Sequence, residues 1–569
     1  MLNKKVKNWL LSFVEKISHE EELILQEIQH YFFKNKTIEL NDTLFERIHK
    51  KNKRRLLGIT YTPIQIREEL TKNVLNILNK KKNIKKIKII DPCCGSGTFT
   101  ITLLEQLEKY KINKVEALKN NLFFYDVDKI SVLITLINLL EYFKRDNIDI
   151  TNINLNTKII NYLNVVEKFD AFITNPPYVK FQNLDINIRK KISDKYSKLL
   201  NGSLGLSAIF LKKMYDDLLD GGVIGIITQN NFFTSNSAKF LRQELQKKIY
   251  KIDNFGSTSI FDKVTAYTCL IYLTKENQNT FEFRKIDKED NFKLKPSKIN
   301  NDSLSPIKWR LAKPNELEDL IKLEKKGTPL NIACRIWVGI ATQFDKGFTV
   351  FKKKNVWNGL SPEGEKFEIE NNIVKPLIRV ADLESENSIE ENNRGIIYPY
   401  EIIGGDVVAI KEIILQNKYP KAYKLLLTWR KKLLSRQKGQ IKKEDWYKWG
   451  RIQSMIPIKN KLLTKTFNKG PCFYFDKTES LFSNGYALTN IHSSYNIKFI
   501  QLVLNSSIFA YYSKLTSFEI EGEYQCYQKN FIERFCLPII DIKKQEELIH
   551  SGLIDNFLIK YYGLKYKLN

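Results

Sequence analysis

The stretch IKIIDPCCGSGTF, residues 87–99, joins an apolar run to a turn that contains two glycines. The apolar residues predict a buried strand, Asp91 lies where that strand ends, and a helix is expected from about Thr98. Gly95 and Gly97 permit unusual backbone angles and let a ligand approach the main chain closely. In a sheet of parallel strands, the turn after the first strand forms part of the crevice in which ligands bind.

Apolar runs and helical segments alternate around this stretch, and the alternation predicts the fold class. Five short runs rich in β-forming residues fall between residues 56 and 285, at 84–90, 120–127, 169–174, 221–228 and 267–274. The segments between them have the apolar spacing of amphipathic helices. This order predicts an α/β domain over residues 56–285, a Rossmann-like and mostly parallel sheet with helices on both faces.

The remaining sequence predicts three further segments. Residues 1–55 have apolar residues at helix-face spacing and are expected to form an N-terminal helical extension. The polar residues 286–306 are expected to link two domains. Residues 307–569, mixed in pattern and rich in aromatic side chains, predict a large α+β C-terminal domain.

Composition limits the class of partner. The chain of 569 residues carries a formal net charge of +28 and has a pI near 9.4, which favours a polyanionic partner such as nucleic acid. A lysine-rich codon bias is the alternative explanation. The seven cysteines form no C-x-x-C pair and no histidine lies between residues 50 and 491, so no metal site is expected there. No cleavage site or membrane-length apolar run is evident, which predicts a cytoplasmic protein without a membrane partner.

Two acids predict the charge of the ligand at the glycine turn. The turn matches only part of a G-x-G-x-x-G pattern, so a dehydrogenase, another nucleotide-binding protein and a methyltransferase all fit it. Asp126 in FFYDVDK ends the next strand, where an acid accepts hydrogen bonds from ribose hydroxyls. Asp91 beside the turn would repel a pyrophosphate but suits a cationic ligand. This favours S-adenosylmethionine, with its sulfonium and ammonium groups, over NAD.

A second unusual turn, FITNPPYVKF at residues 172–181, follows another predicted strand of the same sheet. Asn175 offers a side-chain carbonyl and Pro176 a main-chain carbonyl, and the two prolines hold both acceptors in place. Two acceptors fixed side by side can hold an amino group and direct its lone pair at an electrophilic methyl group. Tyr178 supplies a flat face on which a base can stack. Such a reaction needs positioning more than a strong base, which agrees with the missing histidines.

Together the motifs carry a family resemblance. DPCCGSGTF followed by NPPY resembles the S-adenosylmethionine-dependent N6-adenine DNA methyltransferases, and GITYTPIQIREEL (58–70) looks like the segment that closes over the methionine end of the cofactor. The order of motifs is that of the gamma class, the TaqI-like and Eco57I-like group. The similarity extends through LLDGGVIGIITQNNFF (218–233) and STSIFDKVTAY (257–267), and so covers roughly residues 56–275.

The resemblance implies a set of site residues. The cofactor-binding residues would be Tyr61, Thr62, Pro63, Asp91, Pro92, Cys93, Gly95, Gly97, Asp126, Val127, Asn161 and Asn175. Val127 would pack on the adenine ring of the cofactor, and Asn161 stands where the family commonly has an acid. The catalytic residues would be Asn175, Pro176, Pro177, Tyr178 and Phe261. Phe261 would stack on the second face of the target base, although a core position explains it equally.

The C-terminal region is expected to bind the nucleic acid. Residues 421–451 hold eleven Lys and Arg against two acids, with tryptophans interleaved, which is typical of phosphate binding with aromatic contacts. A solvated helix face is the alternative. Segments 336–348, 375–383 and 521–540 resemble the target-recognition domains of such methylases. The predicted DNA contacts are Arg379, Arg430, Lys431, Lys432, Trp446, Trp449 and Arg451.

Several functions remain open at this stage. The resemblance implies methylation of adenine N6 in duplex DNA, with the base flipped out of the helix and with a separately encoded cognate restriction endonuclease as a further partner. A cytosine C5 enzyme needs a nucleophilic cysteine, and Cys472 lies far from the glycine turn in the sequence. The alternatives are an RNA adenine methyltransferase, a release-factor glutamine methyltransferase, a combined restriction–modification subunit and a non-catalytic DNA-binding protein.

Overall fold

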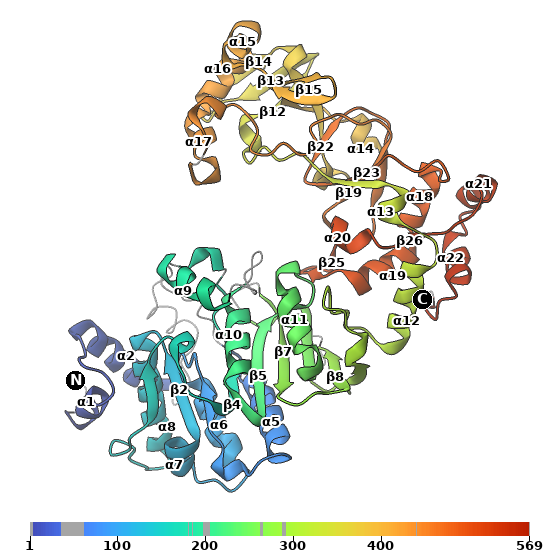
Figure 1. Ribbon diagram of the computed structural model, residues 1–569. Coiled ribbons are helices and arrows are strands. Elements are labelled where there is room, and N and C mark those ends of the chain that lie inside the picture. The colour runs from blue at the N-terminus through green and yellow to red at the C-terminus, as the bar shows by residue number, and fades with distance from the viewer. Residues whose placement is uncertain are drawn as a thin grey trace. The chain divides into compact units, whose positions relative to one another are not determined.

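The computed structural model describes residues 4–35, 62–179, 181–184, 186–196, 205–261, 266–286, 292–439 and 441–567 (Figure 1). The chain divides into two compact units, Met1–Lys313 and Pro314–Asn569. Among the described helices, none is both long enough and apolar enough to cross a bilayer.

A nine-stranded sheet forms the centre of the first unit, in the order β3-β2-β1-β4-β5-β7-β6-β8-β9. Figure 1 shows β2, β4, β5, β7 and β8 following one another in that order. The strands are β1 Ile89–Asp91, β2 Leu122–Asp126, β3 Asn156–Ile159, β4 Phe169–Thr174, β5 Leu218–Gln229, β6 Ile249–Ser259, β7 Tyr267–Thr274, β8 Thr280–Lys285 and β9 Ser297–Asn300. The first five are parallel to one another, and β7 pairs antiparallel with both β5 and β6.

Helices cover both faces of this sheet. They are α1 Lys4–Leu11, α2 His19–Asn35, α5 Ile64–Asn79, α6 Thr98–Glu108, α7 Lys114–Glu116, α8 Lys129–Arg145, α9 Ile186–Tyr196, α10 Leu206–Asp216 and α11 Lys239–Leu245. Because side chains alternate along a strand, Ala171 and Ile173 of β4 belong to the core formed with α5, α6 and α8. Phe172 points the other way and reaches Phe210 of α10 through Tyr162. The predicted α/β fold class is confirmed.

Glycine allows α5 to pack closely against the middle of the sheet. A Cβ atom added to Gly225 of β5 would lie 2.4 Å from Val74 Cγ2 and 3.2 Å from Leu70 Cδ1, both on α5. No side chain fits that gap, so the glycine fixes the distance between helix and strand. The position of α5 matters because its N-terminus carries Thr62 and Pro63, two of the predicted cofactor residues.

The structure differs from the sequence prediction at three places in this unit. Residues 84–86 form a 3₁₀ turn, and the strand itself begins at Ile89. The predicted linker 286–306 is wrong, because it contains β9, which pairs antiparallel with β8 at the edge of the sheet. The first unit then runs on to Lys313. Polar residues hid β9 because an edge strand needs few apolar side chains.

The second unit combines three main sheets with helices. Its strands are β10 Thr328–Pro329, β11 Arg335–Val338, β12 Thr349–Lys353, β13 Val356–Leu360, β14 Lys366–Ile369, β15 Val374–Arg379, β16 Arg394–Ile397, β17 Tyr400–Ile403, β18 Asp406–Ala409, β19 Lys461–Lys465, β20 Phe467–Asn468, β21 Phe473–Asp476, β22 Leu481–Ser483, β23 Gly485–Thr489, β24 Glu519–Ile520, β25 Tyr524–Cys526 and β26 Cys536–Leu537. Its helices are α12 Pro314–Lys325, α13 Leu330–Ala333, α14 Asn387–Glu390, α15 Glu412–Lys418, α16 Pro420–Thr428, α17 Arg430–Leu434, α18 Ile497–Leu504, α19 Ser507–Thr516, α20 Lys529–Ile532, α21 Ile542–Ser551 and α22 Ile554–Tyr562. One core joins α12 and α18–α22, and another joins β12–β16 to α15–α17.

Candidate active site

The carboxyl ends of β1, β2, β3 and β4 bring the predicted cofactor and base residues to one edge of the sheet. Because these strands are parallel neighbours, Asp91 and Asp126 both lie at that edge. Hydrogen bonds connect the strand ends directly: the Gly95 amide donates to Asp126 Oδ2 at 3.0 Å, and Thr174 Oγ1 donates to Asp91 Oδ1 at 2.7 Å. Thr174 immediately precedes Asn175, so the two unusual turns of the sequence meet here.

The glycine turn is held by the helix that follows β2. Thr135 Oγ1 on α8 donates to the Gly95 carbonyl at 3.1 Å, and Asn138 Nδ2 donates to the Ser96 carbonyl at 2.6 Å. The backbone of Gly97 is left-handed, with φ 77°, and its amide donates to the Cys94 carbonyl at 2.8 Å. The turn is therefore rigid before any ligand binds.

The two glycines of the turn are expected to respond differently to substitution. A Cβ atom on Gly97 would lie 2.6 Å from Thr135 Cγ2, whereas nothing lies within 4 Å of a Cβ on Gly95 (φ 56°). Gly97→Ala should lower the free energy of unfolding by about 3 kcal/mol, from strain and overpacking together. Gly95→Ala, the matched control, should lower it by only about 1 kcal/mol from strain alone. Urea unfolding measures both, and equal losses would contradict this account.

Asp91 is a buried carboxylate with one oxygen that accepts no hydrogen bond from the described residues. Its Oδ1 atom accepts hydrogen bonds from the Cys93 amide and from Thr174, but Oδ2 has no hydrogen-bond partner in the described part of the chain. Burial raises the pKa of Asp91 to about 7, and the negative charge of Asp126 adds to the rise. An acid held in this way gains most from a cationic or hydrogen-bond-donating ligand.

Asp126 is the second acid of this edge. Its Oδ1 accepts from the Asp128 amide at 2.9 Å while Oδ2 accepts from Gly95. Burial raises the pKa of Asp126 to about 6, against the lowering effect of these backbone hydrogen bonds. Val127 follows with 57% of its surface exposed, an apolar side chain open to cover a ring.

Thr62 links the start of α5 to the Asn-Pro-Pro-Tyr turn. Asn175 Nδ2 donates to Thr62 Oγ1 at 3.0 Å, so the donor arm of the amide points at Thr62. Arg67, fully buried, holds this segment in turn: Nε donates to the Thr62 carbonyl at 3.0 Å, and Nη1 donates to the Thr98 carbonyl at 2.9 Å and to Thr102 Oγ1 at 3.2 Å. One arginine thus ties the first turn of α6 to the segment that orients Asn175.

Tyr178 and Phe261 lie together beyond that turn. Their ring centroids are 6.1 Å apart with planes inclined by 55°, and Tyr178 Oη donates to the Ile227 carbonyl at 3.3 Å. Burial raises the pKa of Tyr178 well above its usual range. Phe261 is 6% exposed and packs in the hydrophobic core of the first unit. That it also stacks on a target base stays a prediction.

The other predicted cofactor residues are distributed around this edge. Asn161 follows β3, and its side chain accepts from the Leu163 amide at 3.1 Å, which caps a short 3₁₀ turn. Pro92 and Pro176 are buried, whereas Pro63, Cys93 and Pro177 are partly exposed. Tyr61 lies outside the described residues. In the described ranges, no three His, Cys, Asp or Glu side chains are grouped to hold a metal ion.

Two of the predicted DNA contacts are wrong. Trp446 is fully buried, Trp449 is 5% exposed, and both belong to the core of β12–β16 and α15–α17. Their indole N–H groups donate to Glu412 Oε1 at 2.8 Å and to the Ile397 carbonyl at 3.2 Å. These tryptophans stabilise the fold and have no face to offer a base. The basic residues that alternate with them in the sequence carry the surface alone.

The predicted basic contacts differ in how they are paired. Arg379 is exposed but donates to Asp382 Oδ1 at 2.7 Å, and Asp382 also pairs with Arg394. Arg430, Lys431 and Lys432 on α17 are exposed, as is Arg451. Among the predicted basic contacts, the three on α17 and Arg451 have no carboxylate partner in the described part of the chain, whereas Arg379 does.

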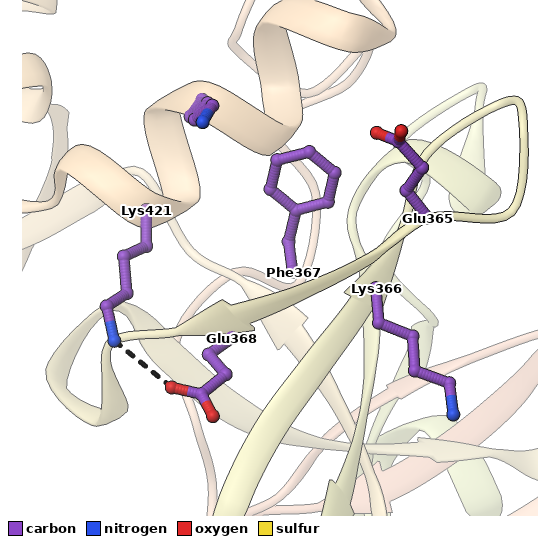
Figure 2. A pocket seen from close by; sticks show the side chains of 6 residues that line it. Glu365, Lys366, Phe367, Glu368 and Lys421 are labelled. Carbon is purple, nitrogen blue, oxygen red and sulfur yellow. Dashed lines mark hydrogen bonds and ion pairs between the residues drawn. The ribbon is translucent and has the colours of Figure 1, made fainter.

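A hollow of about 480 Å³ between β14 and α16 does not add to these basic contacts. It is lined by Glu365, Lys366, Phe367, Glu368, Lys421 and Lys424. Figure 2 shows Lys421 paired with Glu368, with 3.2 Å between Nζ and Oε2. Because acids alternate with lysines around the hollow, it does not concentrate positive charge.

The sequence reasoning missed Thr174 and Arg67. Thr174 ends an apolar strand and looks like any buried strand residue, and only its distance to Asp91 reveals its role. Arg67 follows the Thr-Pro segment in IQIREEL, where an arginine suggests a solvated helix face. A charged residue at a position that the helix period places on the buried face was the available signal.

Known proteins resemble this chain in sequence and fold. Residues 106–261 match the family model for the Eco57I restriction-modification methylase. The chain is 24% identical to the type II restriction enzyme and methyltransferase RM.Eco57I of Escherichia coli, over 89% of this chain and 59% of that protein. It is 25% identical to the type II methyltransferase M.BanIII of Aneurinibacillus aneurinilyticus, over 69% of this chain and 74% of that protein.

A solved structure supports the fold. The type IIL restriction-modification enzyme MmeI, solved in complex with DNA, aligns with a TM-score of 0.64 at 15% identity, over 91% of this chain and 73% of that one. These matches confirm the predicted resemblance to restriction–modification methylases. The chain spans 59% of the length of the Escherichia coli relative.

Proposed function

We propose that this chain, whose residues 106–261 match the Eco57I restriction-modification methylase family, is an S-adenosylmethionine-dependent DNA methyltransferase that modifies N6 of a flipped-out adenine. The observation that carries the proposal is the junction of the two turns at one sheet edge. Thr174 Oγ1 binds Asp91 and Asn175 Nδ2 binds Thr62, so the acid for a cationic ligand and the acceptors for an amine are neighbours.

The residues of the glycine turn fit S-adenosylmethionine. Asp91 Oδ2 is a buried acceptor that lacks a donor among the described residues, which suits an ammonium or sulfonium group. The space beside Gly95 is open and Val127 exposes an apolar surface. The residues proposed to hold the cofactor are Tyr61, Thr62, Pro63, Asp91, Pro92, Cys93, Gly95, Gly97, Asp126, Val127, Asn161 and Asn175. When bound, the cofactor supplies an electrophilic methyl group.

The Asn-Pro-Pro-Tyr turn would hold the target amine. With Nδ2 directed at Thr62, the amide of Asn175 presents its carbonyl arm as the acceptor, and the Pro176 carbonyl provides the second. Accepting both N–H groups withdraws the amine lone pair from the ring and aims it. Tyr178 would hold the base flat, and Phe261 would cover its other face. Preorganised acceptors of this kind replace a strong base.

The second unit is proposed to select the DNA sequence. Its exposed Arg430, Lys431 and Lys432 would contact phosphates, with the other cations of that surface. Adenine as the target, duplex DNA rather than RNA, and a separately encoded cognate endonuclease are parts of the same proposal. The relatives support methylation within a restriction–modification system: M.BanIII is named a type II methyltransferase, and RM.Eco57I is named a combined type II restriction enzyme and methyltransferase, which keeps a combined enzyme as the alternative to a separate endonuclease.

Expression in a host without DNA methylation tests the function. Modification-sensitive sequencing should find new N6-methyladenine at one sequence motif, and the Asn175→Ala chain should leave the genome unmodified. Methylation of cytosine, of RNA, or of release factors in place of adenine in DNA would overturn the proposal. An unmodified genome, with protein shown to be folded by circular dichroism, would do the same.

A further inference from the structure

Arg436 is a buried arginine that connects separate segments of the second unit through hydrogen bonds. The residue is 6% exposed, and its guanidinium donates to four carbonyls: Leu433 at 2.8 Å, Thr342 at 2.8 Å, Trp446 at 2.9 Å and Lys448 at 2.9 Å. No carboxylate pairs with it in the described residues. Burying an arginine against carbonyls alone is expensive, so the geometry that it fixes is specific. It joins the end of α17 to loop 341–345, through Thr342, and to the segment 446–448, which leads into loop 450–454.

Three residues near this junction have left-handed backbones, and loop 341–345 and Gln437 both form hydrogen bonds with Gly450. Gln343 (φ 62°), Gln437 (φ 51°) and Ser454 (φ 52°) have left-handed backbones, which are uncommon for residues other than glycine. The Gly450 amide donates to the Thr342 carbonyl at 3.0 Å, and Gln437 Nε2 donates to the Gly450 carbonyl at 3.0 Å. A Cβ atom on Gly450 would lie 2.3 Å from Gln343 Oε1. Such strain persists only where surrounding contacts impose it, and it is common at ligand-contact sites.

The surface above this junction holds more cations than acids: Glu444 is exposed, Asp445 pairs with Lys448, and Arg430 lies over the Trp446 ring, 5.2 Å from its centroid. In the described ranges, no carboxylate pairs with the exposed cations around it, which are Arg430, Lys431, Lys432, Lys442, Lys443 and Arg451. Elsewhere in the unit, Asp382 pairs with Arg379 and Arg394, and Glu368 pairs with Lys421, whereas the exposed Lys352, Lys353 and Lys354 have no carboxylate partner among the described residues. Ile452, next to Arg451, is 86% exposed. An apolar side chain beside unpaired cations suits a groove of DNA, where it can contact thymine methyl groups.

We propose that loops 341–345 and 450–454 read base edges, with Gln343 and Arg451 as specificity-determining residues and α17 as the phosphate contact. The inference rests on the proposed DNA methyltransferase function and adds where the sequence is read. A glutamine amide can hydrogen-bond adenine in two places, and arginine can do the same with guanine in the major groove. Both side chains are exposed, while their backbones are fixed through Arg436 and Gly450. The reading atoms are thus preorganised without being buried.

Binding to duplexes that carry the motif found by methylome sequencing tests this proposal. Gln343→Ala and Arg451→Ala should each weaken cognate binding by about 10- to 100-fold and abolish discrimination at one base pair. Replacing Arg430, Lys431 and Lys432 by glutamine should weaken binding to all duplexes and lower the salt slope by about 3. The matched control replaces the exposed Lys352, Lys353 and Lys354 and should leave the slope near that of the parent.

The outcomes separate the two proposals. If the parent chain methylates a motif but Gln343→Ala and Arg451→Ala keep full discrimination, or lose affinity equally for every duplex, base reading by these loops is refuted. Base reading is also refuted if Gln343→Ala and Arg451→Ala keep full DNA binding and lose only the binding of a purified cognate endonuclease. If the parent methylates nothing, the proposed function itself fails. Gln343→Asn and Arg451→Lys repeat the measurement where an alanine variant does not fold, and thermal melting identifies those cases.

Discussion

Replacing Asn175 by alanine is expected to lower the rate of methyl transfer by about 100- to 1,000-fold, the effect of losing one preorganised polar group at a reacting atom. The substitution removes one of two carbonyls that would hold the amine and leaves Pro176 in place. Asn175 is also one of the predicted cofactor residues and bonds Thr62, so the affinity for S-adenosylmethionine should fall, but by much less than the rate. Single-turnover kinetics with tritiated cofactor measure the rate, and calorimetry measures cofactor binding.

A matched substitution and a conservative one sharpen this result. Asn164→Ala removes an exposed asparagine from the turn after β3 and should leave the rate unchanged. Thr62→Val removes an acceptor that orients Asn175 Nδ2 and should produce a smaller loss, because the amide keeps its carbonyl but loses one of the contacts that orient it. A Thr62→Val enzyme as inactive as Asn175→Ala would mean that Thr62 acts mainly on the cofactor. A fully active Asn175→Ala enzyme would refute the role of the turn.

Asp91→Asn is expected to weaken S-adenosylmethionine and, at the same time, stabilise the protein without it. The neutral amide loses a charge-assisted contact, so the dissociation constant should rise by about 10- to 100-fold. In the absence of the ligand, the charged carboxylate lowers the free energy of unfolding, since burial disfavours the charge and raises the pKa to about 7. The neutral asparagine removes this cost of burying a charge. Affinity and stability should therefore change in opposite directions, which a simple packing defect does not do.

The stabilisation should depend on pH in a defined direction. In the unfolded chain Asp91 ionises near pH 3.8, but in the folded chain only near pH 7. The free energy of unfolding of the parent therefore decreases as the pH rises from about 4 to about 7, by at most about 1.4 kcal/mol for each pH unit. The Asp91→Asn variant has no such decrease. The difference between their free energies of unfolding should grow from pH 4 to pH 7 and then stay constant. Asp126 titrates in both proteins and largely cancels.

Urea unfolding across this range, with Asp220→Asn as the exposed control, checks the prediction. The control should show no growth of the difference with pH. A constant difference for Asp91→Asn would mean that the carboxylate is already solvated in the folded chain. Unchanged cofactor affinity would instead remove Asp91 from the binding site while leaving the folding argument intact.

The first unit was readable from the sequence because its signals are local. IKIIDPCCGSGTF contains strand, acid and glycine turn in one stretch, and the observed strands overlap all five predicted runs. Parallel order alone then brings Asp91, Asp126 and Asn175 to one edge. Contacts such as Thr174 with Asp91, separated by 83 residues, have no local signature and needed the structure.

The second unit was harder to read because its signals are ambiguous. Tryptophans among lysines occur both on nucleic-acid surfaces and on amphipathic segments whose aromatic face is buried. Trp446 belongs to the second class, and the glutamate that accepts its N–H lies 34 residues away. Similarly, the strained conformation of Gln343 cannot be inferred from its residue type, since glutamine has no preference for left-handed backbone.

Arg67 gives the active site an order of assembly during translation. Its guanidinium bonds the Thr62 carbonyl but also Thr98 and Thr102, which follow it by 31 and 35 residues, and Asn175 comes 113 residues after Thr62. At about 5–20 residues per second, α6 leaves the ribosome a few seconds after α5, and the Asn-Pro-Pro-Tyr turn leaves it several seconds later. The Arg67 contacts between α5 and α6 can therefore form before the Asn-Pro-Pro-Tyr turn is available. The segment that orients Asn175 is then already positioned when Asn175 is made.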